Sequence, residues 1–181
     1  MLAVVHNSPV STATGVDALV AARHGRKGLK VFLELSRVRK RELQERLTAA
    51  LPEWFGQPMS NTKYATLAEI LDGYVVESDD QRCGLLLLKY HSPISAEVYW
   101  IGVDPAYHRQ GLGRALMDAA INDASTQGVR YLFVATLHPD LQYEPFQRTR
   151  RFYEALGFVY AHEEHFPANP ASPIAHYLKQ L

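Results

Sequence analysis

The sequence predicts a mixed α/β (α+β) fold, with a mostly antiparallel, twisted sheet of six to seven strands, a central parallel pair and about four helices. Three observations predict it. Three strand patterns follow one another between residues 74 and 103, and the turns between them are short enough to favour an antiparallel meander. A helix pattern of about four turns then leads to another strand, and such a unit crosses over right-handed into a parallel pair. A late helix and a terminal hairpin complete the chain.

Each element follows from the spacing of its apolar residues. Strand patterns, in which branched or aromatic residues gather or alternate, lie at residues 30–36, 74–78, 83–91, 95–103, 129–137, 158–164 and 174–181. Helix patterns, in which apolar residues recur every three or four positions, lie at residues 39–51, 61–73, 111–127 and 147–156. Pro52 ends the first helix, and the second has Asn61 as its expected cap and Gly73 as its expected stop. Trp54 and Phe55 lie in the loop between these helices, where they either fold into the core or line the mouth of a site.

Length and composition restrict the kind of protein. The 181 residues suit one domain, which we expect at residues 30–181, preceded by a variable or flexible segment at residues 1–29. Acidic and basic residues balance at 19 each, so no overall field attracts nucleic acid or an anionic membrane. The single cysteine, Cys83, excludes an internal disulfide framework and fits the cytoplasm. No apolar run reaches the roughly 18 to 20 residues that a membrane-spanning helix needs.

Two glycines at the start of the third helix indicate a phosphate site. A helix begins with unpaired N–H groups and the positive end of its dipole, and Gly111 and Gly113 allow a phosphate to approach this backbone closely. The dinucleotide-binding fingerprint would need a third glycine where this chain has Leu116, and the Gly-Lys-Ser/Thr of the Walker loop is absent. The two glycines alone are a weak signal, because such a turn often exists only for its geometry.

Four features together resemble the GNAT superfamily of N-acetyltransferases. They are the strand AEVYWIGVDP, the turn AYHRQGLGRAL, the strand that follows it and the later segment RRFYEALGF. The resemblance covers about residues 30–181 and is most specific from Ala96 to Phe158. It implies a GNAT-like sheet whose central parallel strands separate at the cofactor site, and acetyl-CoA as the cosubstrate, with no metal.

The resemblance also implies which residues bind the cofactor. The turn would bind the pyrophosphate through backbone amides, and the preceding strand would bind the thioester arm with backbone N–H groups exposed by a bulge. The matching positions are Ile101, Gly102, Val103, Arg109, Gln110, Gly111, Leu112, Gly113 and Arg114. A glycine inside a strand often marks a bulge or a close approach, although Gly102 could equally be a packing glycine in a plain core strand. Two positions depart from the family pattern: His108 replaces the usual Arg or Gln, and Phe146 replaces an asparagine that often contacts the cofactor.

Two residues match catalytic positions of the family. Glu97 matches the general base of histone acetyltransferase members, and strand alternation places it on one face with Tyr99, Ile101 and Val103. The alternative for Glu97 is an exposed acid or a structural ion pair. Tyr153 matches the tyrosine that protonates the coenzyme A thiolate.

Helical spacing predicts how Tyr153 is oriented. Phe152 and Leu156 are four residues apart and should form the buried stripe of the last helix. Tyr153 would then be turned away from the centre of that stripe, so that its hydroxyl could reach the cofactor sulfur.

Other candidate groups point less clearly to function. His162 and His165 of the HEEH segment would face opposite sides of a strand, which disfavours a metal site. Cys83 suits a core thiol better than a nucleophile. His138 follows a strand at the end where ligands collect, so it is an alternative base or only a loop histidine.

The sequence therefore predicts an acetyl-CoA-dependent N-acetyltransferase that transfers acetyl directly to a primary amine of a small molecule or protein in a ternary complex. A non-catalytic acyl-CoA-binding sensor of the same fold is the alternative, and transfer of a longer acyl group is a third reading. No nucleic-acid or membrane partner is expected. The amine acceptor and the oligomeric state, including a homodimer, stay open.

Overall fold

The computed structural model describes residues 28–166 and 169–181, so the expected N-terminal segment lies, up to residue 27, outside the described residues. The elements, in chain order, are β1 (Leu29–Glu34), α1 (Arg37–Ala50), α2 (Pro58–Ala68), β2 (Asp72–Ser78), β3 (Gln81–Ser92), β4 (Ser95–Val103), the short 3-10 helix η1 (Pro105–Tyr107), α3 (Leu112–Thr126), β5 (Tyr131–Leu137), α4 (Glu144–Glu154), β6 (Val159–Phe166) and β7 (Asn169–Gln180).

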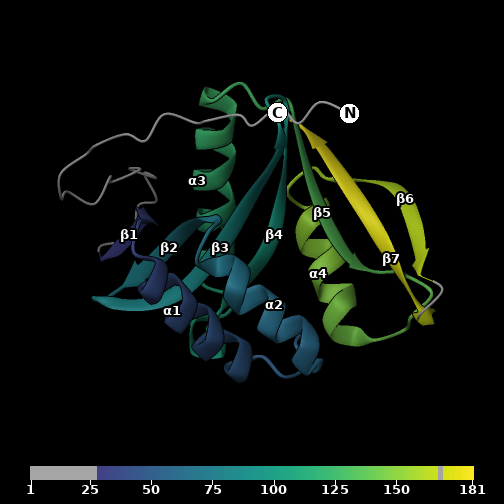
Figure 1. Cartoon of the computed structure of the whole chain (residues 1–181), viewed down its shortest axis with the longest axis horizontal. Coiled ribbons are helices and arrows are strands. Elements are labelled where there is room, and N and C mark those ends of the chain that lie inside the picture. The colour runs from purple at the N-terminus through teal and green to yellow at the C-terminus, as the bar shows by residue number, and fades with distance from the viewer. Residues whose placement is uncertain (1–27, 167–168) are drawn as a thin grey trace, which may run out of the picture.

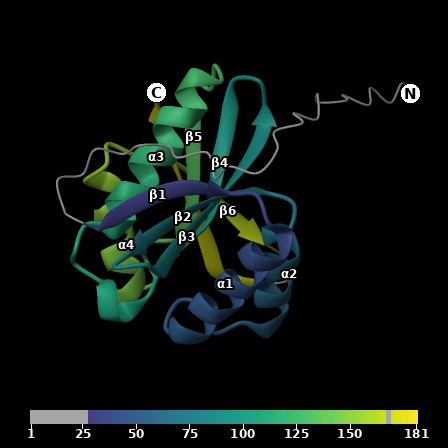
Figure 2. The same ribbon diagram turned by 90° about the vertical axis from the view of Figure 1, so that its left-hand side faces the viewer.

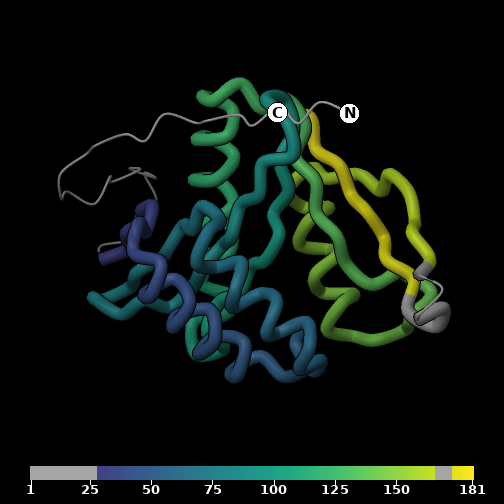
Figure 3. The backbone as a smooth tube through the Cα atoms, viewed as in Figure 1, coloured from purple at the N-terminus to yellow at the C-terminus, as the bar shows by residue number. Residues whose placement is uncertain are grey.

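The predicted sheet is confirmed. Within the described ranges seven strands form one sheet in the order β1-β2-β3-β4-β5-β7-β6. Neighbouring strands are antiparallel except β4 and β5, which are parallel and joined by the α3 crossover. The β6–β7 hairpin continues the sheet on the far side of β5 (Figure 3).

Two layers of helices cover the sheet, as Figure 2 shows from the side. On one face, α1 and α2 pack over a core that contains Leu47, Leu87 and Trp100. On the other face, α3 and α4 cover a larger core that includes Leu116 and Val134. Burying both faces of the central strands requires nearly continuous apolar runs, and β3 supplies one with four consecutive leucines. The two cores give the sheet two distinct faces, and the candidate site uses both.

The boundaries of α2 correct the sequence prediction. The helix begins at Pro58, whose fixed φ suits a first helical position, and the residue before it, Gln57, is its cap. Asn61 lies inside the helix, where its side-chain amide donates to the carbonyl oxygen of Phe55 at 2.7 Å. Gly73 does not end the helix but lies in β2, where it pairs with Glu34 and Leu87, and a Cβ there would be 2.5 Å from Cδ of Lys40.

Local caps explain the other helix starts. Ser36 caps α1 by accepting from the amide of Arg39 at 3.3 Å, so α1 begins earlier than its apolar stripe. Pro145 lies in the first turn of α4, which likewise starts before the predicted residue 147. Gly111, with φ of +85°, caps α3, as expected from the glycine-containing turn.

Candidate functional site

A cleft opens where β4 and β5 separate. The two strands pair only from Ser95 with Tyr131 to Val98 with Val134. Figure 1 shows them diverging beyond that point, with α4 visible between them. The cleft has a volume of about 1530 Å³ and is lined by β4, β5, α4, the turn before α3 and the loop after α1. No described strand pairs with this edge of β4 beyond Val98, so its backbone groups there are available to a ligand.

A β-bulge at Tyr99 changes which face each side chain of β4 meets. Leu87 of β3 pairs with Trp100 and Leu88 pairs with Val98, so Tyr99 is an extra residue between them. Val98 belongs to the core under α3 and α4. Tyr99 and Trp100 both pack on the α1–α2 face, although they are consecutive in the chain.

The bulge shows that one expectation about Glu97 was wrong. Alternation keeps Glu97 and Tyr99 on the α1–α2 face up to the bulge. Beyond the bulge the alternation is reversed, and Ile101 and Val103 pack against the α3–α4 core. Glu97 therefore does not share a face with Ile101 and Val103, and the two sets of candidates meet only through the cleft that all of them line.

Gly102 lies three residues beyond the bulge and does not form it. A Cβ on Gly102 would be 2.4 Å from a ring carbon of Trp100, so the glycine makes room for the indole. The indole in turn stacks on Phe55 with ring centroids 5.2 Å apart. Gly102 thus has the packing role that the sequence left open, and it also lines the cleft. Its contact with a cofactor stays a prediction.

The turn before α3 has the backbone geometry of an anion site. Arg109 and Gly111 both have positive φ, +60° and +85°. The first intrahelical bond runs from the Ala115 amide to the Gly111 carbonyl at 3.0 Å, which leaves the amides of Leu112 and Gly113 without intrahelical acceptors. Gly111 has no side chain to cap them. The residues present therefore fit a phosphate group, because these amides and the helix dipole favour an anion at this point.

The side chains around the turn provide charge and support. Arg109 is exposed and lines the cleft. Arg114 also lines it and donates to the carbonyl oxygen of Ala155, the C-terminal cap of α4, at 3.2 Å. Gln110 folds back so that its side-chain amide donates to the Ala106 carbonyl at 3.2 Å. The guanidinium groups of Arg109 and Arg114 therefore add positive charge beside the amides.

His108 has a structural role at the position where the sequence departs from the family pattern. Its Nε2 lies 2.7 Å from the carbonyl oxygen of Val103, so the ring N–H can donate to the last residue of β4. The imidazole also meets the Trp54 indole edge to face, with ring centroids 6.3 Å apart. His108 thus ties the end of β4 to the turn that follows.

Tyr153 lies on α4 and lines the cleft, but its burial differs from the prediction. The residue is only 5% exposed and belongs to the α3–α4 core, whereas Phe152 is partly buried at the edge of that core. Contact with the Phe158 ring, 5.8 Å away between centroids, helps to draw Tyr153 inward. Burial raises the pKa of its hydroxyl, which has no hydrogen-bond partner in the described part of the chain.

Thr136 is a cleft residue that the sequence did not single out. It lies near the end of β5, beyond the last residue that pairs with β4, and it is 5% exposed. Its hydroxyl is buried without a partner among the described residues, yet the residue lines the cleft. A buried hydroxyl without a partner is costly, so a ligand that supplied one would be favoured. The only sequence signal was one small polar residue in an apolar strand.

Glu97 contacts His91, a partner that the sequence did not single out although a structural pairing was its alternative to the base role. Its Oε2 lies 2.8 Å from Nε2 of His91 on β3, and the Glu97 side chain is 20% exposed. The register explains the pair, because Lys89 lies opposite Glu97 and His91 is two residues further along the same face. The other candidate base, His138, does not line the cleft, and its Nε2 lies 2.9 Å from Glu163.

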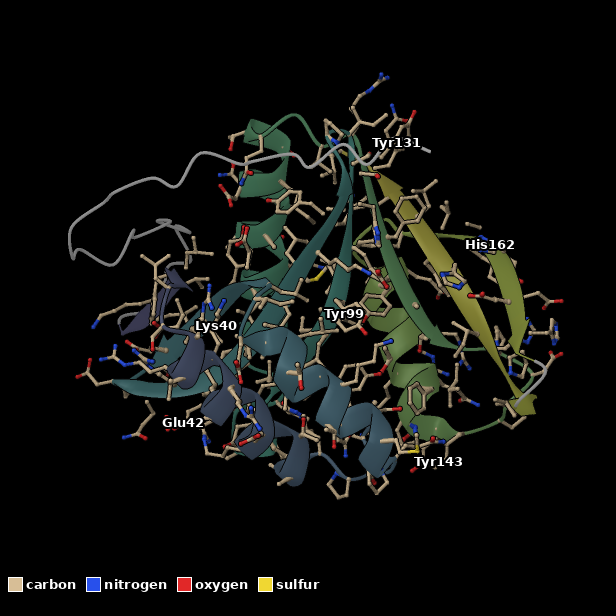
Figure 4. The ribbon with its side chains drawn as sticks, in the orientation of Figure 1. Lys40, Glu42, Tyr99, Tyr131, Tyr143 and His162 are labelled. Carbon is tan, nitrogen blue, oxygen red and sulfur yellow. The ribbon has the colours of Figure 1, made fainter. Side chains whose placement is uncertain are left out.

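Aromatic side chains form a wall on the α1–α2 side of the cleft. Phe55 stacks on Trp100, and Tyr64 of α2 meets both Phe55 and Tyr99 edge to face, at 6.0 and 5.9 Å between centroids. Burial raises the pKa of Tyr64, and the adjacent Tyr99 and the charge of Glu97 add to the effect. Figure 4 shows Tyr99 near the middle of the molecule, between α2 and β5.

Trp54 extends this side of the cleft toward α4. Its indole N–H lies 3.0 Å from the hydroxyl of Thr149 and 3.2 Å from the carbonyl oxygen of Pro145. Trp54 and Phe55, whose environment the sequence left open, therefore both line the cleft while being partly buried. We call this side of the cleft, with Glu97 and the aromatic wall, its acceptor side.

The remaining polar candidates lie elsewhere. The His162 and His176 rings stack with centroids 4.4 Å apart, at the β6–β7 hairpin. Within the described ranges no group of three or more His, Cys, Asp or Glu side chains is arranged to hold a metal ion. Cys83 is 1% exposed, and burial raises the pKa of its thiol, which suits the core thiol that the sequence predicted. No described helix is long and apolar enough to cross a membrane.

Comparison with known proteins identifies the family of this domain and supports its fold. Residues 71–160 match the family model described as an acetyltransferase (GNAT) domain. A GNAT-family protein from Desulfovibrio desulfuricans is 21% identical with a TM-score of 0.72, over 84% of this chain and 98% of that one. The ribosomal-protein-S18-alanine N-acetyltransferase of Escherichia coli is 18% identical with a TM-score of 0.66, over 84% and 93%.

A third structure, a GNAT family acetyltransferase from Elizabethkingia anophelis, contains bound acetyl-CoA. It is 14% identical with a TM-score of 0.65, over 86% of this chain and 100% of that one. At these identities the likeness shows the fold. No curated protein matches the sequence significantly.

Proposed function

Because this chain belongs to the GNAT acetyltransferase family, we propose that it is an N-acetyltransferase that transfers acetyl directly from acetyl-CoA to a primary amine in a ternary complex. One observation carries the proposal. A single cleft is lined by the N-terminus of α3, which no side chain caps, by Tyr153 and by Glu97. It therefore joins an anion site to a candidate acid and a candidate base. Such an arrangement lets two substrates bind together and react without a covalent enzyme intermediate.

The cofactor would lie on the α3–α4 side of the cleft. The backbone amides from residue 109 to residue 114 bind the pyrophosphate, assisted by the charges of Arg109 and Arg114. The thioester arm follows the unpaired edge of β4, where the amides of Ile101 and Val103 hydrogen-bond to it and polarise its carbonyl. The unpartnered hydroxyl of Thr136 on the opposite strand suits a further contact with this arm.

The chemical step needs one base and one acid. The amine nitrogen forms the new C–N bond to the acetyl carbon, and the C–S bond to coenzyme A breaks. Glu97 accepts the proton that the amine loses, and His91, whose side chain is 40% exposed, links Glu97 to solvent. Tyr153 donates a proton or a strong hydrogen bond to the thiolate. Because burial raises its pKa, this hydroxyl keeps its proton at ordinary assay pH.

Two measurements test the proposal. Isothermal titration with acetyl-CoA, with desulfo-CoA and NADH as controls, should show micromolar binding of acetyl-CoA and no binding of NADH. Release of free coenzyme A with a panel of amines then tests transfer. Binding of acetyl-CoA without amine-dependent release would instead support the acyl-CoA sensor, and no binding at all would reject both functions.

The enzyme is favoured over the sensor by the location of its two candidate groups. A sensor would be the better interpretation if Glu97 and Tyr153 faced separate surfaces, but both line one cleft. We further propose that residues 30–181 act as one catalytic domain in the cytoplasm. The buried thiol of Cys83 agrees with a reducing compartment.

A further inference from the structure

Two lysines lie next to Tyr99 without a carboxylate partner among the described residues, and one of them, Lys63, lines the acceptor side of the cleft. Nζ of Lys63, on α2, lies 6.0 Å from the centroid of the Tyr99 ring, and Nζ of Lys89, on β3, lies 5.4 Å from it. Lys89 is directly opposite Glu97 in the β3–β4 register, but the Glu97 carboxylate turns to His91 instead. In the part of the chain that the structure describes, neither ammonium group forms a hydrogen bond or an ion pair.

The acids that line the cleft each have a partner among the described residues. Glu97 lies 2.8 Å from His91, Glu164 lies 3.2 Å from His176, and Glu53 lies 3.4 Å from Arg148. Among the described residues, no carboxylate therefore neutralises Lys63 or Lys89 beside Tyr99. The zero net charge of the whole chain does not cancel these two positive charges, because salt screens the interaction between charges more than about 10 Å apart.

The surface between these lysines is aromatic. Tyr99 lies beneath both ammonium groups and contacts Tyr64, while the Phe55 and Trp100 stack continues the wall. Such a wall favours an apolar or planar body on the ligand, and the ammonium groups at its border favour an anionic group. Glu97, at the same wall, is the group toward which the ligand's amine would point.

We propose that the acceptor is a primary amine that also carries an oxyanion group, a carboxylate or a phosphate, on a largely apolar body, as in an amino acid. Lys63 and Lys89 would bind the oxyanion while the amine meets Glu97. The two positive charges would also lower the pKa of the amine, which increases the fraction present as the neutral nucleophile. This inference rests on the proposed N-acetyltransferase function and names its substrate class.

Matched pairs of amines test the inference. Phenylalanine is compared with phenethylamine and phenylalaninamide, and phosphoethanolamine with ethanolamine, by coenzyme A release at fixed acetyl-CoA. We expect kcat/KM to be about tenfold or more higher for the oxyanion-bearing member, equal to about 1.4 kcal/mol or more, because charge-assisted hydrogen bonds are stronger than neutral ones. The two pairs also distinguish a carboxylate from a phosphate.

Substitutions of Lys63 and Lys89 test whether these lysines bind the oxyanion of the acceptor. Lys63→Gln and Lys89→Gln should together remove the preference for the oxyanion, so that each oxyanion-bearing amine reacts no faster than its partner without the oxyanion. Lys30→Gln is the matched control, because Lys30 is an exposed lysine of β1 that pairs with Asp80 at 3.1 Å. It should leave every amine unaffected.

The outcomes distinguish this inference from the function on which it rests. If acetyl-CoA is bound and amines are acetylated without regard to the oxyanion, the substrate class is wrong and the N-acetyltransferase function stands. The substrate class is also wrong if no oxyanion-bearing amine is acetylated while its partner without the oxyanion reacts. Absence of acetyl-CoA binding, or of turnover with every amine, would count against the function itself.

Discussion

Replacing Gly111 and Gly113 by alanine separates the two reasons for a glycine in the turn before α3. Gly111 has φ of +85°, and no heavy atom lies within 4 Å of the position of a Cβ. Its alanine variant would therefore suffer only backbone strain, about 1–2 kcal/mol. Gly113 lies inside the helix, and its Cβ would meet the Phe152 ring at 3.4 Å, an ordinary contact. Alanine there should stabilise the helix by about 0.5–1 kcal/mol.

The two substitutions should therefore affect stability in opposite directions and cofactor binding in the same direction. In Gly111→Ala, the strained turn relaxes in the free protein, so restoring the amide cradle weakens acetyl-CoA binding by roughly 5- to 30-fold for 1–2 kcal/mol. In Gly113→Ala, the new methyl group occupies space beside the helix N-terminus where a phosphate must approach. We expect about tenfold weaker binding, equal to about 1.4 kcal/mol, in a protein that is more stable.

Gly128→Ala is the matched control. Gly128 follows α3 at its other end, with φ of +90° and only the Pro93 carbonyl oxygen, at 4.0 Å, near its Cβ position. Its variant should lose stability much as Gly111→Ala does, without a change in cofactor binding. Chemical denaturation and titration with acetyl-CoA measure the two quantities. If Gly113→Ala binds acetyl-CoA as tightly as the unchanged protein, the N-terminus of α3 is not the phosphate site.

Four further predictions concern Tyr153, Tyr90 and Gly102. Tyr153→Phe should lower kcat by about 100-fold while the dissociation constant of acetyl-CoA changes little; steady-state kinetics and titration compare the two, and equal losses reject the acid role. Burial raises the pKa of Tyr153, so kcat should not fall between pH 8 and 10 through loss of its proton, and a pH–rate profile with a falling limb there would contradict this. Burial raises the pKa of Tyr90 to about 12 in the folded protein. Tyr90 therefore stabilises the fold fully below pH 10, and this stabilisation is lost as the pH rises toward 12. Measuring the free energy of unfolding against pH in this range tests the prediction. Gly102→Ala should destabilise the fold by about 1–3 kcal/mol, because its Cβ would lie 2.4 Å from the Trp100 ring, and an unchanged thermal midpoint would refute that packing role.

Local signals allowed much of the fold to be predicted. The start of α3 follows from Gly111, and the parallel pair follows from a strand, a helix and a strand in succession. The boundaries of α2 were missed because the competing signals, Pro58 and Asn61, could each begin a helix. Gly73 looked like a helix stop, but its environment is set by Lys40, thirty-three residues earlier in the chain.

The resemblance pointed to several residues that line the cleft, but residue spacing did not predict which way their side chains face. Glu97 and Tyr153 line one cleft, and their roles as base and acid stay predictions. Alternation failed at Tyr99, because a bulge depends on how β4 pairs with β3 and not on β4 alone. Helical spacing failed for Tyr153, because Phe158 and the sheet beneath α4 decide which side chain is drawn inward.

The sequence by itself determined the order of helices and strands, the crossover and the glycine-containing turn, because each depends on residues only a few positions apart. The tertiary structure decided which face Glu97, Ile101 and Val103 occupy, and it brought Lys63 and Lys89 to the same tyrosine ring. The physical reason is that strand register and side-chain packing join residues that are distant in the chain. The cleft and its charge are properties of those long-range contacts.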